Sequence, residues 1–118
     1  MKKTLAILFG TAMATVALVL PTIGVGAAQT VRVTEVDGRI SLAARPKSGV
    51  VKFVVRNSGG DAHDFWVRGG GKQMKSRVLI PGRSVTITAT LKKGVKYQYW
   101  CGVSDHAEEG MRGSFIAR

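Results

Sequence analysis

The side chains with the richest metal chemistry lie in one stretch near the C-terminus. Cys101, His106 and Met111 follow the spacing C-x4-H-x4-M, and Cys101 is the only cysteine in the 118 residues. The chain has two histidines, and the other one, His63, lies 38 residues before Cys101. A thiolate, two imidazoles and a thioether are soft and borderline donors of the kind that suits copper. These residue types therefore predict one mononuclear copper site, with Met111 as a weak axial donor.

The spacing of the three C-terminal donors has a geometric reason. A metal ion needs donors that converge from several directions, and one straight strand cannot supply them. A strand that ends at Cys101, a tight loop that carries His106 and a return at Met111 can place three donors around one point. His63 must then come from a neighbouring strand, so we expect the rest of the chain to form a rigid β-scaffold for these side chains.

Each of these residues also has a simpler explanation. Cys101 could be a dimerising thiol or a buried bystander, because a single cysteine cannot form an internal disulfide. His63 could be a satisfied core histidine, and Met111 an ordinary core methionine. A free thiol outside the cytoplasm is open to oxidation, and coordination would remove that risk. We therefore favour the interpretation of all four residues as ligands.

The first 28 residues predict a secretory signal peptide and not a part of the fold. Two lysines open the chain, an uncharged apolar run follows from Leu5 to Leu20, and Pro21 ends that run. Small residues precede the expected cleavage near Ala28, which leaves residues 29–118 as one periplasmic or secreted domain. An uncleaved membrane anchor is the alternative, although the apolar run is short for a span of about 20 residues.

The basic charge of the chain does not indicate nucleic acid as a partner. The formal net charge is +11, and without the two leader lysines 16 basic and 7 acidic residues leave +9. The basic residues are scattered and do not form a stripe, and the protein is predicted to be exported. The charge is either a solvated surface or a means of steering toward an acidic partner or an anionic membrane surface. We expect a monomer that meets redox partner proteins transiently.

Alternating apolar residues and turn signals predict an all-β fold after residue 30. The expected strands are 31–36, 39–44, 50–57, 63–67, 76–80, 84–91, 97–101 and 113–117. A tight turn is expected at Asp37-Gly38, and a mobile surface loop at Gly69-Gly70-Gly71 and the basic residues after it. Seven or eight short strands in the 90 residues that follow the leader are typical of a β-sandwich.

The pattern resembles that of the cupredoxins of the plastocyanin, pseudoazurin and azurin kind, over nearly the whole predicted mature chain. The matching stretches are Val51–Asn57, Gly59–Phe65, the Pro81-Gly82 turn with the strand after it, Tyr97–Cys101 and Gly110–Gly113. The resemblance implies a Greek-key β-sandwich that binds one copper ion and shuttles between Cu(I) and Cu(II). By match of motif, His63, Cys101 and His106 are the strong ligands and Met111 is the axial one.

One position beside the predicted site departs from the family pattern. Plastocyanins and azurins usually carry Asn directly after the first histidine, where it ties the two ligand loops together, and this chain has Asp64. The carboxylate could accept the same backbone hydrogen bonds, but it adds a charge next to the metal. The step from Cys101 to His106 resembles that of azurin, whereas the step of 38 residues from His63 to Cys101 is too short for azurin's helical flap.

These features favour a one-electron carrier with a type 1 copper site. A protein for copper storage, delivery or resistance without redox turnover is the main alternative, but delivery needs open or labile positions that a closed set of four donors lacks. A metal-free sandwich for adhesion or assembly would make the donor pattern accidental. An oxidase or reductase needs further copper centres, which two histidines cannot supply, so we expect no enzyme.

The two histidines are expected to differ in exposure. His63 is predicted to be the buried imidazole, and His106 to lie on a loop near the surface as the exit for the electron. Asp105, Glu108 and Glu109 flank His106 in a chain that is otherwise basic. These acidic residues serve either solubility or the ordering of a docking face for a partner of complementary charge.

Overall fold

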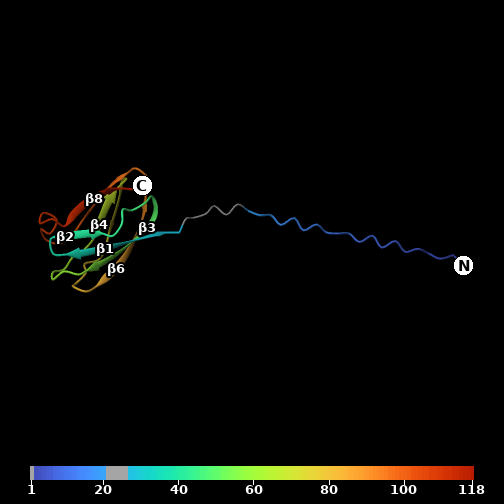
Figure 1. The fold of residues 1–118 in the computed structure, drawn as a ribbon, viewed down its shortest axis with the longest axis horizontal. Helices are drawn as coiled ribbons and strands as arrows, with labels where there is room; N and C mark the ends of the chain where they lie inside the picture. Colours follow the sequence, from blue (N-terminus) through green and yellow to red (C-terminus); the bar gives the residue numbers. More distant parts are fainter. Residues whose placement is uncertain (1, 21–26) are drawn as a thin grey trace.

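The computed structural model describes residues 2–20 and 27–118, and its folded part consists of strands (Figure 1). The strands are β1 (Gln29–Val36), β2 (Arg39–Leu42), β3 (Gly49–Asn57), β4 (Trp66–Gly69), β5 (Lys72–Lys75), β6 (Ser84–Leu91), β7 (Lys96–Trp100) and β8 (Arg112–Ile116). They form two four-stranded sheets, with the orders β2-β1-β3-β6 and β5-β4-β7-β8. The chain crosses between the sheets after β3, β5 and β6. The prediction of an all-β Greek-key sandwich of seven or eight strands is confirmed.

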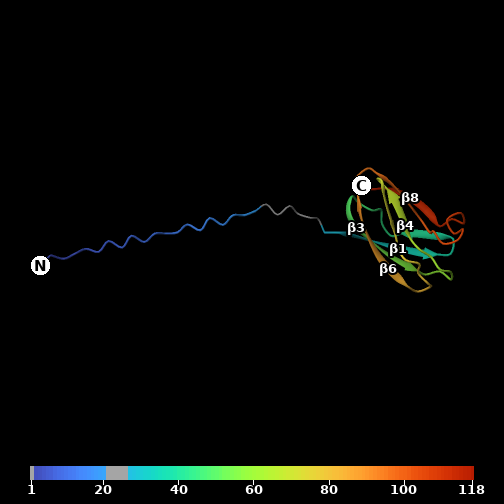
Figure 2. The ribbon, with the colours of Figure 1, turned by 180° about the vertical axis from the view of Figure 1, so that it is seen from behind.

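The N-terminal segment lies apart from the sandwich. Residues 2–20 are exposed and run away from the sheets as an extended chain (Figures 1 and 2). Among the residues that the structure describes, no helix has the length and apolar character needed to cross a membrane. The predicted break at Pro21 and the small residues up to Gly26 lie outside the described residues. β1 begins at Gln29, directly after the expected cleavage position, and the cleavage itself stays a prediction.

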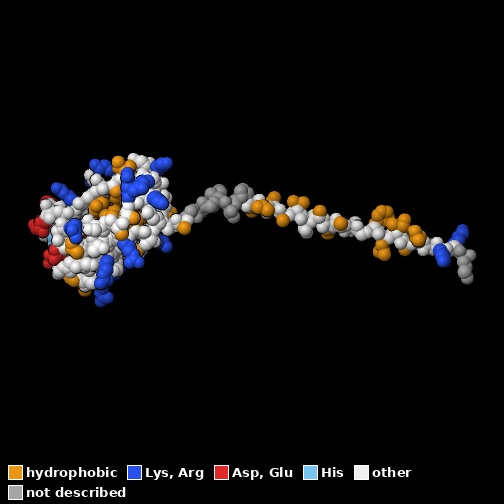
Figure 3. Space-filling model, in the orientation of Figure 1, with side chains coloured by type: hydrophobic (Ala, Val, Ile, Leu, Met, Phe, Trp, Pro, Cys, Tyr) orange, Lys and Arg blue, Asp and Glu red, His pale blue; other side chains and the backbone are white. Residues whose placement is uncertain are grey.

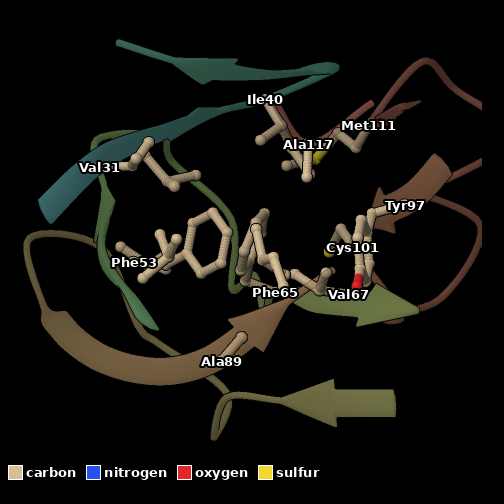
Figure 4. Packing of buried hydrophobic residues seen from close by; sticks show 14 of the residues in the cluster. Val31, Ile40, Phe53, Phe65, Val67, Ala89, Tyr97, Cys101, Met111 and Ala117 are labelled. Atoms are coloured by element: carbon tan, nitrogen blue, oxygen red, sulfur yellow. The ribbon is translucent and has the colours of Figure 1, made fainter. Parts of the chain in front are cut away.

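The core lies between the two sheets and follows from the alternation along the strands. Val51, Phe53 and Val55 of β3 are fully buried, because every second side chain of a strand points to the same face. Phe53 reaches across the sandwich, and its ring centroid lies 5.6 Å from that of Phe65 (Figure 4). The ring centroid of Phe115 lies 6.4 Å from that of Phe53. These aromatic contacts join the two sheets.

The prediction for residues 63–80 was wrong in its details. β4 begins at Trp66, and β5 pairs with it as a hairpin where a mobile loop was expected. Gly70 and Gly71 form the turn with φ angles of 57° and 75°, which glycine adopts without steric cost. β5 lies at the edge of its sheet and exposes three of its four side chains. Its sequence therefore lacks the apolar alternation that identifies a half-buried strand.

The strand predicted at 76–80 is instead a loop with one short pairing. Leu79 forms an isolated antiparallel bridge with His63. The N–H group of each residue donates to the carbonyl of the other, over 3.0 Å from His63 and 2.7 Å from Leu79. This bridge anchors the backbone of His63 just before β4.

Candidate metal centre

The four candidate donors reach one region of the sandwich from separate segments. His63 lies in the bridge with Leu79, Cys101 directly follows β7, and Met111 directly precedes β8. His106 lies in the turn-rich loop between Cys101 and Met111. Two backbone hydrogen bonds of 3.0 Å close this loop, from the N–H of Cys101 to the carbonyl of Met111 and from the N–H of Met111 to the carbonyl of His106.

The structure brings the predicted cysteine and both predicted histidines together. Nδ1 of His63 lies 3.1 Å from Nδ1 of His106. Sγ of Cys101 lies 3.8 Å from the first of these nitrogens and 3.6 Å from the second. All three donor atoms lie within 4.8 Å of one another. Since metal–nitrogen and metal–sulfur bonds of the zinc type measure about 2.0–2.3 Å, one ion could contact all three donors with little movement of the side chains.

Met111 lies in the same part of the core. Its side chain is fully buried and belongs to the hydrophobic cluster that contains Cys101 (Figure 4). The backbone pairing between Met111 and Cys101 keeps the two residues adjacent. Ligation by the Met111 thioether stays a prediction that the fold is able to accommodate.

The environment of Cys101 favours the protonated thiol when no metal is bound. Burial is the largest influence and raises the pKa of the thiol, and the nearby carboxyl groups of Asp64 and Glu35 raise it further when they are ionised. Hydrogen bonds from the backbone N–H groups of Asp64 and Val103 lower the pKa in part. Only the thiolate binds a metal ion, so metal binding at this site must displace the proton from Cys101.

Asp64 joins the segment of His63 to the segment of Cys101 by a hydrogen bond, as its position directly after His63 predicts. Its Oδ1 accepts a hydrogen bond of 2.6 Å from the backbone N–H of Gly102, and its Oδ2 accepts one of 2.9 Å from Nε1 of Trp66. Both partners are donors, so an asparagine amide could satisfy only one of them as an acceptor. This gives a physical reason for Asp at a position where the plastocyanins and azurins that the sequence resembles usually carry Asn. A side chain at position 102 would lie 2.5 Å from Nε1 of Trp66, which explains the glycine there.

The sequence analysis missed a contact to the other nitrogen of His63. Asp37, in the turn between β1 and β2, places Oδ1 2.9 Å from Nε2 of His63. The hydrogen bond with His63 lowers the pKa of Asp37, and backbone hydrogen bonds from Asp61 and Gly60 lower it further. The pattern Asp37-Gly38 indicated only a turn, because the sequence separation of 26 between Asp37 and His63 hid their proximity.

Glu35 is a second residue near the site that the sequence analysis missed. It is fully buried, and neither oxygen of its carboxyl has a hydrogen-bond partner among the described residues. Burial, and secondarily the charge of Asp64, raises its pKa to about 8, so the group is mostly protonated at pH 7. Glu35 shares a face of β1 with Val31 and Val33, and this alternation could have predicted that its side chain points into the core.

The donors lie beneath an acidic end of an otherwise basic molecule. His106 is half-buried, unlike the other three candidate donors. Five exposed acidic residues belong to the segments around the donors: Asp37, Asp61, Asp105, Glu108 and Glu109. Figure 3 shows the acidic side chains gathered at the end of the sandwich that faces away from the N-terminal segment.

No protein-family model and no curated protein sequence matches the chain. Solved structures of the same architecture do match it. Dithionite-reduced auracyanin from Roseiflexus castenholzii aligns with a TM-score of 0.64 and 17% identity, over 79% of this chain and 99% of that one. Auracyanin B aligns with a TM-score of 0.66 and 19% identity, over 77% and 89%. Auracyanin A, a blue copper protein from Chloroflexus aurantiacus, aligns with a TM-score of 0.61 and 16% identity, over 75% and 98%. The chain therefore has the cupredoxin fold.

Proposed function

We propose that this protein binds one copper ion at a type 1 site and carries single electrons. The proposed ligands are His63, Cys101, His106 and Met111. The convergence of one thiol and two imidazole nitrogens within 4.8 Å is the observation that carries the proposal. These donors come from separate segments of a cupredoxin fold, and a set of two imidazoles, a thiolate and a weak thioether matches copper that transfers electrons.

The way in which the donors are held supports redox cycling. When bound, copper supplies the one-electron couple between Cu(I) and Cu(II). The backbone of His63 is fixed by its bridge to Leu79, and Cys101 is held by its pairing with Met111. His63, Cys101 and Met111 are fully buried, which restricts their movement. A change in the oxidation state of the copper therefore requires little rearrangement of the protein.

His106 provides the route to a partner protein. It is the only one of the four proposed ligands whose side chain is partly exposed. The acidic residues around it suit a redox partner that presents a basic surface, and encounters of this kind use small interfaces, below about 1,200 Å². We propose a monomer without enzymatic activity of its own that meets such partners transiently.

We further propose that the protein works outside the cytoplasm after removal of residues 1–28. The folded domain begins with β1 at Gln29, so cleavage near Ala28 would leave every strand intact. Mass spectrometry of the protein from a cell fraction checks this point, with a mature N-terminus at residue 29 as the expected result. An intact N-terminus would indicate a membrane-anchored form.

Absorption and electron paramagnetic resonance spectra of the purified protein after loading with Cu(II) test the proposed function. An intense blue thiolate-to-copper charge-transfer band that disappears and returns reversibly on reduction and oxidation is expected. Cys101→Ser is the control and should lose the band, because the charge transfer needs the thiolate. A colourless protein that holds only Cu(I) would contradict the carrier and favour copper storage or delivery.

A further inference from the structure

We propose that Asp37 is a positioning residue for the metal ligand His63 and that it lowers the reduction potential of the centre. Its carboxylate selects the tautomer that presents Nδ1 of His63 to the metal and strengthens that nitrogen as a donor. The inference rests on the proposed copper site and goes beyond it, since Asp37 itself touches no metal.

The two nitrogens of His63 face two different groups. Nε2 lies 2.9 Å from Oδ1 of Asp37, whereas Nδ1 faces Sγ of Cys101 at 3.8 Å and Nδ1 of His106 at 3.1 Å. A neutral imidazole carries one N–H group and one lone pair. A carboxylate only accepts hydrogen bonds, so the proton belongs on Nε2 and the lone pair of Nδ1 points toward the other donors.

Asp37 is itself held in place. The backbone N–H of Gly60 lies 3.1 Å from both carboxylate oxygens, and the N–H of Asp61 lies 3.2 Å from Oδ1. Together with the contact to His63 at 2.9 Å, these hydrogen bonds hold the carboxylate of Asp37 in one orientation. The turn after β1 is thereby fastened to the segment that carries His63.

Gly59 leaves the space that the contact needs. A Cβ atom at this position would collide with Oδ1 of Asp37 and would lie 3.0 Å from Nε2 of His63. The φ angle of Gly59 is not in the left-handed region, so the backbone conformation does not require glycine here. Close approach between Asp37 and His63 is the constraint, and a methyl group at position 59 would separate them.

The contact makes the two histidine ligands unequal. Among the described residues, no side chain accepts a hydrogen bond from Nε2 of His106. A carboxylate behind an imidazole raises the basicity of the ligand, and a more basic ligand stabilises Cu(II) over Cu(I). The side chain of Asp37 is 51% exposed, so water and salt screen its charge at a distance and the effect passes mainly through the direct hydrogen bond.

The first test measures the reduction potential of the copper-loaded full chain and three variants by voltammetry. Asp37→Ala removes the acceptor and should weaken Cu(II) binding about tenfold, the lower end of the affinity loss for such a partner. If Cu(I) binding is unchanged, this loss raises the potential by about 59 mV for one electron. Gly59→Ala keeps the charge but displaces it and should shift the potential in the same direction. Asp61→Asn is the control, because it removes a neighbouring exposed charge without touching His63, and should leave the potential nearly unchanged.

The second test uses the metal-free protein and is independent of copper. Nitrogen NMR of the His63 ring should show one tautomer, protonated at Nε2, in the wild type and a mixture in Asp37→Ala. Asp37→Asn retains an acceptor for His63 and should keep this tautomer, with a potential between those of the wild type and Asp37→Ala.

The outcomes separate the two proposals. A wild-type protein without a blue band would overturn the copper site, whereas the tautomer experiment would still decide the role of Asp37. An unchanged potential and an unchanged tautomer in folded Asp37→Ala would overturn the positioning role. If Asp37→Ala does not fold, Gly59→Ala and Asp37→Asn decide: an unchanged potential in both contradicts the inference.

Discussion

The two histidines of the centre are held in opposite ways. His63 is fully buried, its backbone pairs with Leu79, and its ring contacts Asp37. His106 is half-buried and lies on a loop. Its backbone N–H donates to the nearby carbonyl of Val103 over 3.1 Å. Long-range contacts of the sandwich thus fix one ligand, and contacts within a short loop fix the other.

This difference indicates a division of roles between the two sides of the centre. The side of His63 sets the position and the donor strength of the ligands, because its contacts come from strands and turns that are distant in sequence. In the proposed electron carrier, the side of His106 would be the one that meets a partner, because an electron leaves most readily where the protein covering is thinnest.

Replacement of each histidine by glycine should give the largest effects. His63→Gly and His106→Gly should both lose the blue band on addition of Cu(II), because each removes a proposed strong ligand. Added imidazole should restore the band in His106→Gly, where the ring position opens to solvent, and should fail in His63→Gly, where the ring is buried. Absorption titrations with imidazole check this. Equal restoration in both variants would remove the distinction between the two histidines.

Loss of the Asp64 hydrogen bonds, which join the segments of His63 and Cys101, should lower the stability of the protein. Asp64→Ala leaves the N–H groups of Gly102 and Trp66 without their acceptor and should lower the free energy of unfolding by about 1–3 kcal/mol. Asp64→Asn keeps one acceptor and should cost about half as much. Urea unfolding of the metal-free proteins measures both, with the exposed Asp61→Asn as a control near zero. A larger loss in Asp64→Asn than in Asp64→Ala would contradict the explanation given for Asp at this position.

The sequence predicted correctly those features of the fold and of the candidate site that depend on residue type and short spacing. The alternation of Val51, Phe53 and Val55 predicted a buried strand face correctly, because burial of one face imposes a period of two. The spacing of Cys101 and His106 predicted that their donor atoms meet, because a short loop confines both residues. These inferences depend on local geometry, which the chain order determines.

The parts that sequence analysis missed depend on contacts between distant segments. Asp37 meets His63 only because the turn after β1 and the segment after β3 lie side by side in the folded sandwich. The edge strand β5 exposes polar and basic side chains, so its pairing with β4 leaves no apolar period in the sequence. A one-dimensional pattern records neither kind of contact, since both depend on which strands become neighbours.

Glu35 provides a test of the buried side through pH. Its pKa is raised from 4.5 to about 8 in the folded state, so folded molecules bind more protons than unfolded ones between these values. Stability should therefore fall as pH rises from about 5 to 8, with a slope of up to about 1.4 kcal/mol per pH unit from this group.

Glu35→Gln is the variant that isolates this contribution. The amide has nearly the same shape but does not titrate, so unfolding of the metal-free variant should depend less steeply on pH than that of the wild type. The two proteins should differ most in slope between pH 5 and 8 and least below pH 4, where the carboxyl is protonated in both states. Parallel pH profiles would show that the Glu35 carboxyl reaches water and does not belong to the buried side.

The smallest expected effect concerns the exposed side. Neutralisation of Asp105, Glu108 and Glu109 by the corresponding amides removes three charges beside His106 and leaves the buried side unchanged. Electron transfer with a cationic redox partner should slow severalfold at low ionic strength, and its rate should depend less on salt, because steering by complementary charge raises the encounter rate and salt screens it.

A control at a distance from the centre makes the result specific to the acidic end. Lys92→Gln together with Lys93→Gln changes charges at the turn before β7, whereas Cys101, His106 and Met111 follow the opposite end of that strand. This double variant should raise the rate slightly and keep a steep salt dependence, because less positive charge then opposes the cationic partner. If the triple variant retains the salt dependence of the wild type, the acidic residues serve only solubility, and the exposure of His106 alone distinguishes this side of the centre.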